Sequence, residues 1–189
     1  MDGLDLLTAD HNRLRGLFTL FQTAHENNDT TAMGELAVRI FAELEVHTAI
    51  EEQIFYPAVH DLSEELAAVV DEGVQEHHVV DVLIEEARAL RPSDAAWVAK
   101  LTVLIESVEH HAEEEETELF PQVRSATEAA TREEWGRRFE KMKADRGVPT
   151  PAEAAQLTTE ELRRRATTQQ IPGRSTMTRD DLIATIDPR

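Results

Sequence analysis

The segment HTAIEEQIFYP at positions 47–57 has a near copy, HAEEEETELFP, at positions 111–121. Aligned without a gap, both segments begin with His, carry two Glu four and five residues later, and end in an aromatic residue followed by Pro. Residues four apart in a helix lie on one face. Each segment therefore predicts a helix that presents a His and a Glu together.

A second pair of segments extends the repeat. The sequence DHNRLRGLF at 10–18 resembles EHHVVDVLI at 76–84, since each has an acid, a His, and then apolar residues three, six and seven positions after the His. The first His of each pair precedes the second by 36 residues in one half of the chain and by 34 in the other. The chain therefore reads as one helical hairpin written twice.

Composition limits the chemistry available to the chain. Its 189 residues are 41% hydrophobic, which is enough for one domain with a real core plus a short appendage. There is no Cys, so disulfides, thiolate metal sites and cysteine nucleophiles are excluded. Any bound metal must be held by His and carboxylates.

Charge separates the chain into two parts. The formal net charge is −19, which opposes binding to nucleic acid or to an anionic membrane. Residues 146–189 are close to neutral, with seven Arg against six Asp and Glu. The N-terminus lacks the features of a signal peptide and no apolar run is long enough to cross a membrane, so we expect a cytoplasmic protein with no membrane partner.

Apolar residues recur at helical spacing and no strand-like alternation is present. The pattern predicts helices over about 4–26, 31–56 and 63–90, and a fourth from Ser93 or Asp94 to beyond Leu119. A fifth is expected to open at the capping pattern Thr131 to Glu134. We expect an all-α fold, an up-down-up-down four-helix bundle with the fifth helix packed outside it.

The predicted domains follow from these elements. Residues 1–145 form the bundle with its extra helix, residues 146–157 form a linker, and residues 158–189 form a small helical tail. The tail reads as helix, extended turn, helix. Thr158 or Thr159 is expected to cap its first helix, and Thr178 with Asp181 its second.

Six polar residues occupy apolar stripes of the four helices, where a bundle normally has none. They are His11, His47, Glu51, His77, His111 and Glu115. A single His in such a position is more often a satisfied core residue than a ligand, but an ionised carboxylate buried without a partner is costly. Two divalent ions, each capped by two His and bridged by the two Glu, would neutralise the group. Imidazole and carboxylate donors suit Fe, Mn or Zn.

The fourth helix offers two registers for its His and Glu. His110 and Glu114 are also four residues apart, but His111 lies ten residues before Pro121, as His47 lies ten before Pro57. This shared spacing selects His111, and it places His110 about 100° away from the stripe.

The segments DH…HxxxEExxFYP and EH…HxxxEExxLFP resemble the hemerythrin-like family, also called HHE cation-binding domains, over about residues 4–125. The resemblance implies two iron ions in an oxo- or hydroxo-bridged non-haem centre. His11, His47, His77 and His111 would be terminal ligands, with Glu51 and Glu115 as bridging carboxylates. It also implies small ligands such as O2, H2O2 and NO, and roles in oxygen binding, sensing of oxygen or iron, or reaction with peroxide or nitric oxide.

The chain departs from the oxygen-carrying members of that family at one position. Those members have a fifth His one turn before the third-helix ligand, where this chain has Gly73. We expect the vacated position to be open, or filled by water or a nearby side chain, with His78 and Asp81 as the nearest candidates. For Asp81 we favour a solvated position.

Three residues near the predicted ligands are expected to have supporting roles. Tyr56 should lie about 100° from the line of the site and pack, with a hydrogen bond from its hydroxyl. Glu52 and Glu116 could contact ligand His residues, although we favour a solvated face for both. His25 and His60 are expected at the surface.

These observations favour decomposition of hydrogen peroxide, a catalase-like reaction, or reaction with nitric oxide. No catalytic residue is predicted beyond the metal centre. The alternative is an oxygen- or iron-binding carrier or sensor without turnover, and a third possibility is a structural zinc-bound or metal-free bundle.

The tail weakly resembles SAP- and Rho-N-type helix-extended-helix modules over about thirty residues. Such a resemblance implies contact with nucleic acid, for which the tail offers Arg163, Arg164, Arg165 and Arg174. Its nearly neutral charge and its acidic neighbour equally favour docking onto the bundle or onto a protein partner. Nucleic acid is therefore expected as a partner only through the tail.

Overall fold

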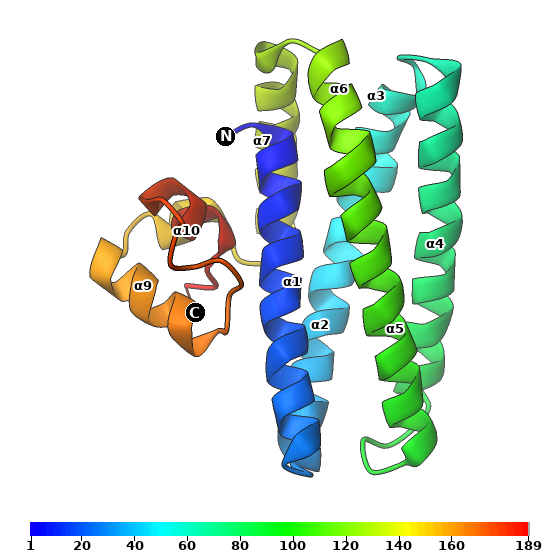
Figure 1. Cartoon of the computed structure of the whole chain (residues 1–189), viewed down its shortest axis with the longest axis vertical. Coiled ribbons are helices and arrows are strands. Elements are labelled where there is room, and N and C mark those ends of the chain that lie inside the picture. Colours follow the sequence, from blue (N-terminus) through cyan, green and yellow to red (C-terminus); the bar gives the residue numbers. More distant parts are fainter. Residues whose placement is uncertain (189) are drawn as a thin grey trace.

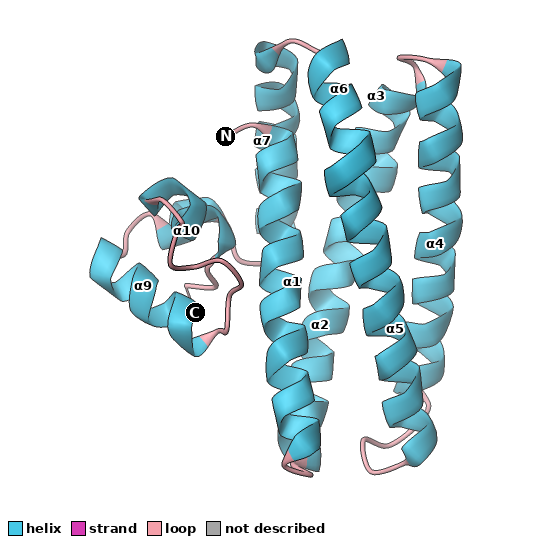
Figure 2. Ribbon diagram, viewed as in Figure 1, coloured by secondary structure: helices cyan, strands magenta, loops and turns pink. Residues whose placement is uncertain are grey.

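The computed structural model describes residues 1–188, and this part of the chain contains helices and no strand (Figure 2). Four long helical rods run alternately up and down and form the bundle (Figure 1). Their main helices are α1 (Gly3–Glu26), α2 (Thr30–Ile50), α4 (Glu64–Arg88) and α5 (Ala95–Glu114). The prediction of an all-α four-helix bundle is confirmed.

Short polar side chains begin three of these helices. The carboxylate of Asp2 accepts a hydrogen bond from the Leu4 amide at 2.9 Å, and Asp29 serves α2 in the same way. The Ser63 hydroxyl caps α4 through the amide of Leu66. These caps satisfy amide groups that have no partner inside the helix.

A π-helical turn interrupts the second and the fourth rod at equivalent places. Helix α2 passes through η1 (Glu51–Phe55) into α3 (Tyr56–His60), and α5 passes through η2 (Glu115–Leu119) into α6 (Phe120–Ala126). A π turn inserts one extra residue. Residues after the turn are therefore rotated by about 100° relative to an uninterrupted α-helix.

Two apolar clusters fill the bundle, one toward each end. One contains Leu14, Phe18, Leu44 and Leu104, and the other contains Leu7, Phe55 and Val123. The residues that separate the two clusters along the rods are polar, so the chain holds a polar layer inside an apolar interior. Such a layer is costly unless its members are paired or bind a charge of opposite sign.

The fifth helix, α7 (Ala129–Asp145), packs against the N-terminal half of α1. Trp135 contacts Phe55 with ring centroids 5.7 Å apart. The helix begins after Glu128, so the predicted start at the pattern from Thr131 to Glu134 was wrong, and that pattern lies inside the first turns.

The tail consists of α8 (Pro151–Ala154), α9 (Thr159–Thr168) and α10 (Arg179–Thr185) around its own small apolar cluster. The predicted caps are confirmed, since Thr158 and Thr178 each form a reciprocal capping box. Helix α8 lies within the predicted linker, and its Ala154 belongs to the tail cluster. The division of the chain into domains stays a prediction.

The tail docks onto the bundle beside α1 (Figure 1). A Cβ at Gly16 would lie 2.6 Å from the carbonyl oxygen of Gln169, so the absence of a side chain there permits this contact. Arg39 of α2 pairs with Asp187 at 2.9 Å. Of the interpretations of the tail, docking onto the bundle is therefore realised. Between residues 1 and 188 no helix is both long and apolar enough to span a membrane.

Candidate metal centre

The six polar residues predicted for the site meet in the middle of the bundle. Each is at most 6% exposed. They come from α1, from α2 with its π turn η1, from α4, and from α5 with its π turn η2. The residues are His11, His47, Glu51, His77, His111 and Glu115.

The four imidazoles form two pairs that face each other through their Nε2 atoms. The Nε2 atoms of His11 and His47 are 3.0 Å apart, and those of His77 and His111 are 3.2 Å apart. Glu51 connects the pairs, because its Oε1 lies 3.2 Å from His47 Nε2 and its Oε2 lies 3.3 Å from His77 Nε2. One carboxylate therefore reaches both halves of the site.

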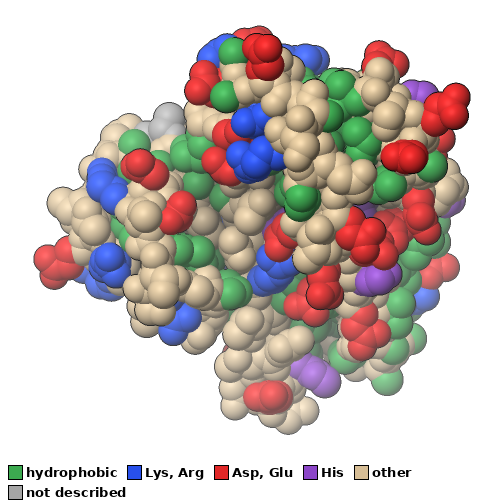
Figure 3. Space-filling view, turned by 45° about the horizontal axis from the view of Figure 1, so that its top comes forward, with side chains coloured by type: hydrophobic (Ala, Val, Ile, Leu, Met, Phe, Trp, Pro, Cys, Tyr) green, Lys and Arg blue, Asp and Glu red, His purple; other side chains and the backbone are tan. Residues whose placement is uncertain are grey.

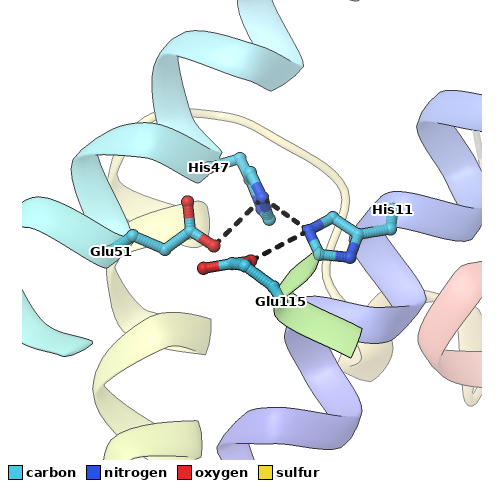
Figure 4. Close-up of side chains that lie close together, drawn as sticks. All are labelled: His11, His47, Glu51 and Glu115. Carbon is cyan, nitrogen blue, oxygen red and sulfur yellow. Dashed lines mark hydrogen bonds and ion pairs between the residues drawn. The ribbon is translucent and has the colours of Figure 1, made fainter. Parts of the chain in front are cut away.

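Glu115 completes the layer from the opposite helix. Its Oε2 lies 3.5 Å from His11 Nε2 and 3.8 Å from His111 Nε2. Figure 4 shows Glu51 and Glu115 converging on the Nε2 atoms of His11 and His47. Four ligand atoms, one from each of these residues, lie within 4.8 Å of one another, a spacing suited to one ion.

Carboxylates hold the other ring nitrogen of three imidazoles. His11 Nδ1 lies 2.8 Å from Glu116, and His77 Nδ1 lies 3.0 Å from Glu52. Because an ionised carboxylate only accepts hydrogen bonds, each Nδ1 carries the proton and each Nε2 keeps a free lone pair. The expected contacts of Glu52 and Glu116 with ligand His residues are therefore present, although the side chain of Glu52 is also 41% exposed, in line with the solvated face that we favoured. The signal was present as a second Glu after each predicted ligand Glu.

The acid before the first His of each repeat lies beside the Nδ1 atom of a predicted ligand His, but only Glu76 is within hydrogen-bond distance, and His47 Nδ1 has no hydrogen-bond partner in the described chain. Glu76 accepts a hydrogen bond from His111 Nδ1 at 2.6 Å, and Asp10 lies 3.8 Å from His47 Nδ1. In the sequence these two acids stand out only as part of the repeat. Each acid contacts the His of the neighbouring rod, which no helical spacing reveals.

Asp10 is held in a buried group of charges beneath α7. It accepts hydrogen bonds from Arg13 at 2.7 Å and from Lys143, and Arg13 also binds Glu43 at 2.5 Å. Burial favours the neutral acid, but the charges of Lys143 and Arg13 outweigh it and hold the pKa of Asp10 well below its usual range. Asp10 is therefore a fixed negative charge beside His47.

Tyr56 enters the site beside Gly73. Its hydroxyl donates a hydrogen bond of 2.9 Å to Glu115 Oε1 and lies 3.4 Å from His111 Nε2. A Cβ at Gly73 would be only 2.9 Å from this hydroxyl. The predicted hydrogen bond of Tyr56 is present, but its predicted place away from the site was wrong, because η1 rotates it inward. His78 and Asp81 are exposed and do not fill the position.

The two halves of the site differ at the residue after each π turn. Tyr56 stacks on His77 with ring centroids 5.5 Å apart, and Phe120 stacks on His11 at 6.1 Å. Only Tyr56 brings a hydroxyl. Burial, with the charge of Glu115, raises the pKa of Tyr56 well above its usual range, so the hydroxyl remains a donor.

The electrostatics of the layer suit a cation. Burial lowers the pKa of His47 to about 3 and also lowers that of His11, so both rings are neutral. Burial raises the pKa of Glu51 and Glu115. Within residues 1–188, neither oxygen of Glu51 nor the Oε2 of Glu115 accepts a hydrogen bond. A set of facing acceptors without donors fits positively charged ligands.

The remaining His residues lie outside this layer. His25 and His60 are exposed, as predicted, and the side chain of His110 is 66% exposed. The spacing to Pro that His47 and His111 share therefore identified His111, which points inward, rather than His110.

A four-helix bundle with four imidazoles and two carboxylates at its centre defines a class of His/carboxylate cation-binding proteins. The model of the family described as hemerythrin HHE cation binding domain matches residues 2–123. The chain belongs to this family.

The chain is also similar to a curated protein of Nostoc sp. (strain PCC 7120) named DNA nickase. The two are 28% identical over 140 residues, which cover 74% of this chain and 38% of the relative. The chain thus matches well under half of that protein's length. No solved structure matches the chain.

Proposed function

We propose that the buried layer holds two iron ions. The His11 and His47 pair would bind one ion, the His77 and His111 pair the other, and Glu51 and Glu115 would bridge them. The observation that carries this proposal is that His77 and His111, whose Nδ1 protons are held by carboxylates, face each other through Nε2 beside three oxygens of Glu51 and Glu115 that accept no hydrogen bond from the described chain. The two Nε2 lone pairs of His77 and His111, 3.2 Å apart, repel each other unless a cation accepts both of them.

The reaction proposed for this centre is decomposition of hydrogen peroxide or reaction with nitric oxide. Bound iron would supply redox chemistry at open coordination positions. Around it, apolar clusters exclude water from the two ends of the layer. Tyr56 donates its one hydroxyl proton to Glu115 Oε1, and a small polar ligand bound beside it would accept that hydrogen bond in place of Glu115. Because a fifth imidazole is replaced by Gly73, reactivity is favoured over reversible carriage.

Metal analysis of the purified protein tests the centre. We expect about two Fe per chain with near-ultraviolet absorption, and loss of iron in His47→Ala and His111→Ala. His60→Ala is the matched control, since His60 is exposed and remote from the layer. One Zn per chain, or no retained metal, would contradict the proposal.

Turnover is tested separately from metal content. Oxygen evolved from added peroxide by the iron-loaded protein, and lost in His47→Ala, would support the peroxide reaction. The alternative is a carrier or sensor of oxygen or iron. That function would be favoured if peroxide were left intact while the reduced protein bound oxygen reversibly.

A second candidate function is cleavage of one DNA strand, which is favoured by the similarity to the Nostoc protein named DNA nickase. The acidic bundle opposes contact with DNA, so the tail arginines would have to supply it. Conversion of supercoiled plasmid to the open circle would support this activity. An intact plasmid in the presence of the iron-loaded chain would exclude it for these 189 residues.

A further inference from the structure

An exposed group of potential ligands lies outside the layer just described. Glu76, His110 and Glu114 each offer one ligand atom within 4.8 Å of the others. His110 Nε2 lies 3.4 Å from Glu114 Oε1, and these side chains are 66% and 47% exposed. Imidazole and carboxylate are ligands for Zn²⁺ and for first-row metals in general.

A cavity of about 80 Å³ joins this group to the buried layer. Glu76 and Glu114 line it together with His111 and Glu115, which are 6% and 3% exposed. Glu115 marks the inner end of this cavity, since its Oε2 accepts no hydrogen bond from the described chain and lies 3.5 Å from His11 Nε2 in the buried layer. Gly73 also lines the cavity, and its lack of a side chain leaves room beside the Tyr56 hydroxyl.

The lining of this cavity is strongly negative. Glu72 and Glu118 add two more carboxylates, and no Lys or Arg is among the lining residues. Acidic side chains are also abundant on the bundle surface at the right of Figure 3, where basic ones are few. A negative cleft with apolar walls raises the local concentration of cations and their rate of association.

The equivalent positions in the other repeat are apolar and buried. By the internal repeat, Leu6, Ile50 and Ile54 take the places of Glu72, Glu114 and Glu118. These three are at most 6% exposed and lie in the cluster that includes Trp135 and Phe139 of α7. Val46 takes the place of His110 and is also buried. Among the described residues, the repeat built from α4 and α5 therefore exposes this group of ligands, and the equivalent positions on α1 and α2 are buried.

We propose that Glu76, His110 and Glu114 form an outer site for a divalent cation, and that the acidic cavity conducts the ion inward to His111 and Glu115. Glu76 links the two sites, because it belongs to the outer group and also accepts the hydrogen bond of His111 Nδ1. This inference rests on the proposed function, since it describes how the buried centre receives its iron.

Anaerobic uptake of Fe²⁺ by the metal-free full chain tests the path. Glu114→Gln with Glu118→Gln removes two charges from the cavity, and Glu109→Gln with Glu113→Gln removes two exposed charges from the same helix outside it. We expect the first variant to load on the order of tenfold more slowly than the second, with equal final iron per chain. Equal rates would overturn the path.

The outer site is tested on protein whose centre is already filled. In equilibrium dialysis, iron-loaded protein should bind additional Zn²⁺, and His110→Ala should lose this binding while His60→Ala keeps it. No additional Zn²⁺, or full binding by His110→Ala, would overturn the outer site. A wild-type chain that takes up no iron would instead refute the proposed function, and the path with it.

Discussion

The hydroxyl of Tyr56 occupies the space that a side chain on Gly73 would fill, since a Cβ there would lie 2.9 Å from its oxygen. The two positions depend on each other, because Gly73 of α4 has no side chain and so leaves room for the phenol of Tyr56 from α3. This phenol is the hydrogen-bond donor of Glu115 Oε1. The space beside Gly73 is thereby occupied by a proton donor.

A double-mutant cycle tests this arrangement. In metal-free protein, Gly73→Ala should displace the hydroxyl, and Tyr56→Phe should remove it, each leaving Glu115 without its donor at a cost of about 1–3 kcal/mol. The better helix propensity of Ala offsets up to about 1 kcal/mol. The double variant should lose clearly less free energy of unfolding, measured with urea, than the two single variants lose when their losses are added. Additive effects would show that the two residues are independent.

Glu51→Gln should have opposite effects with and without iron. In metal-free protein, burial raises the pKa of Glu51 above its unfolded-state value of 4.5. Its contribution to the free energy of unfolding is therefore fully present below about pH 4.5 and is lost as the pH rises toward the folded-state pKa. Gln does not titrate, so the variant lacks this loss. Its free energy of unfolding should exceed that of the wild type by up to about 1.4 kcal/mol for each pH unit above pH 4.5. With iron bound, the variant should be the less stable protein. Unfolding between pH 5 and 7 measures both.

Lys143 should be important for stability although it lies outside the centre. It is 1% exposed and pairs with Asp10. Removing one member of a buried charge pair costs about 3–5 kcal/mol, so Lys143→Met should lower the free energy of unfolding by that order. Lys141→Met is the control, because the pair between Lys141 and Asp145 is exposed and should change stability by less than about 0.5 kcal/mol. Similar losses in both variants would contradict the buried network.

Gly16→Ala should loosen the tail from the bundle. The new Cβ would lie 2.6 Å from the Gln169 carbonyl oxygen, which is backbone and cannot move alone. A docking penalty of about 1.4 kcal/mol corresponds to a tenfold change in the undocked population. Trypsin cleavage after Arg146, at the start of the linker, should therefore become at least tenfold faster. Gly34→Ala is the control, since its Cβ would meet only the Pro92 ring, and equal cleavage rates would argue against the contact.

Much of the fold could be predicted from spacing. The apolar stripes located the four rods, and the caps Thr158 and Thr178 located the tail helices. The start of α7 was missed because a capping pattern also occurs inside helices. The π turns were missed because periodicity is read over a window longer than one turn, so a single extra residue leaves the pattern intact.

The sequence by itself determined which six residues share the interior, because helical periodicity is a local property that a repeat makes visible twice. It also identified His111 rather than His110. Only the tertiary structure decided what surrounds them. The contacts of Glu76, Glu116 and Lys143 join separate helices, and the place of Tyr56 depends on a π turn and on the small size of Gly73 across the bundle. Such contacts follow from how the helices pack, which spacing along one chain does not encode.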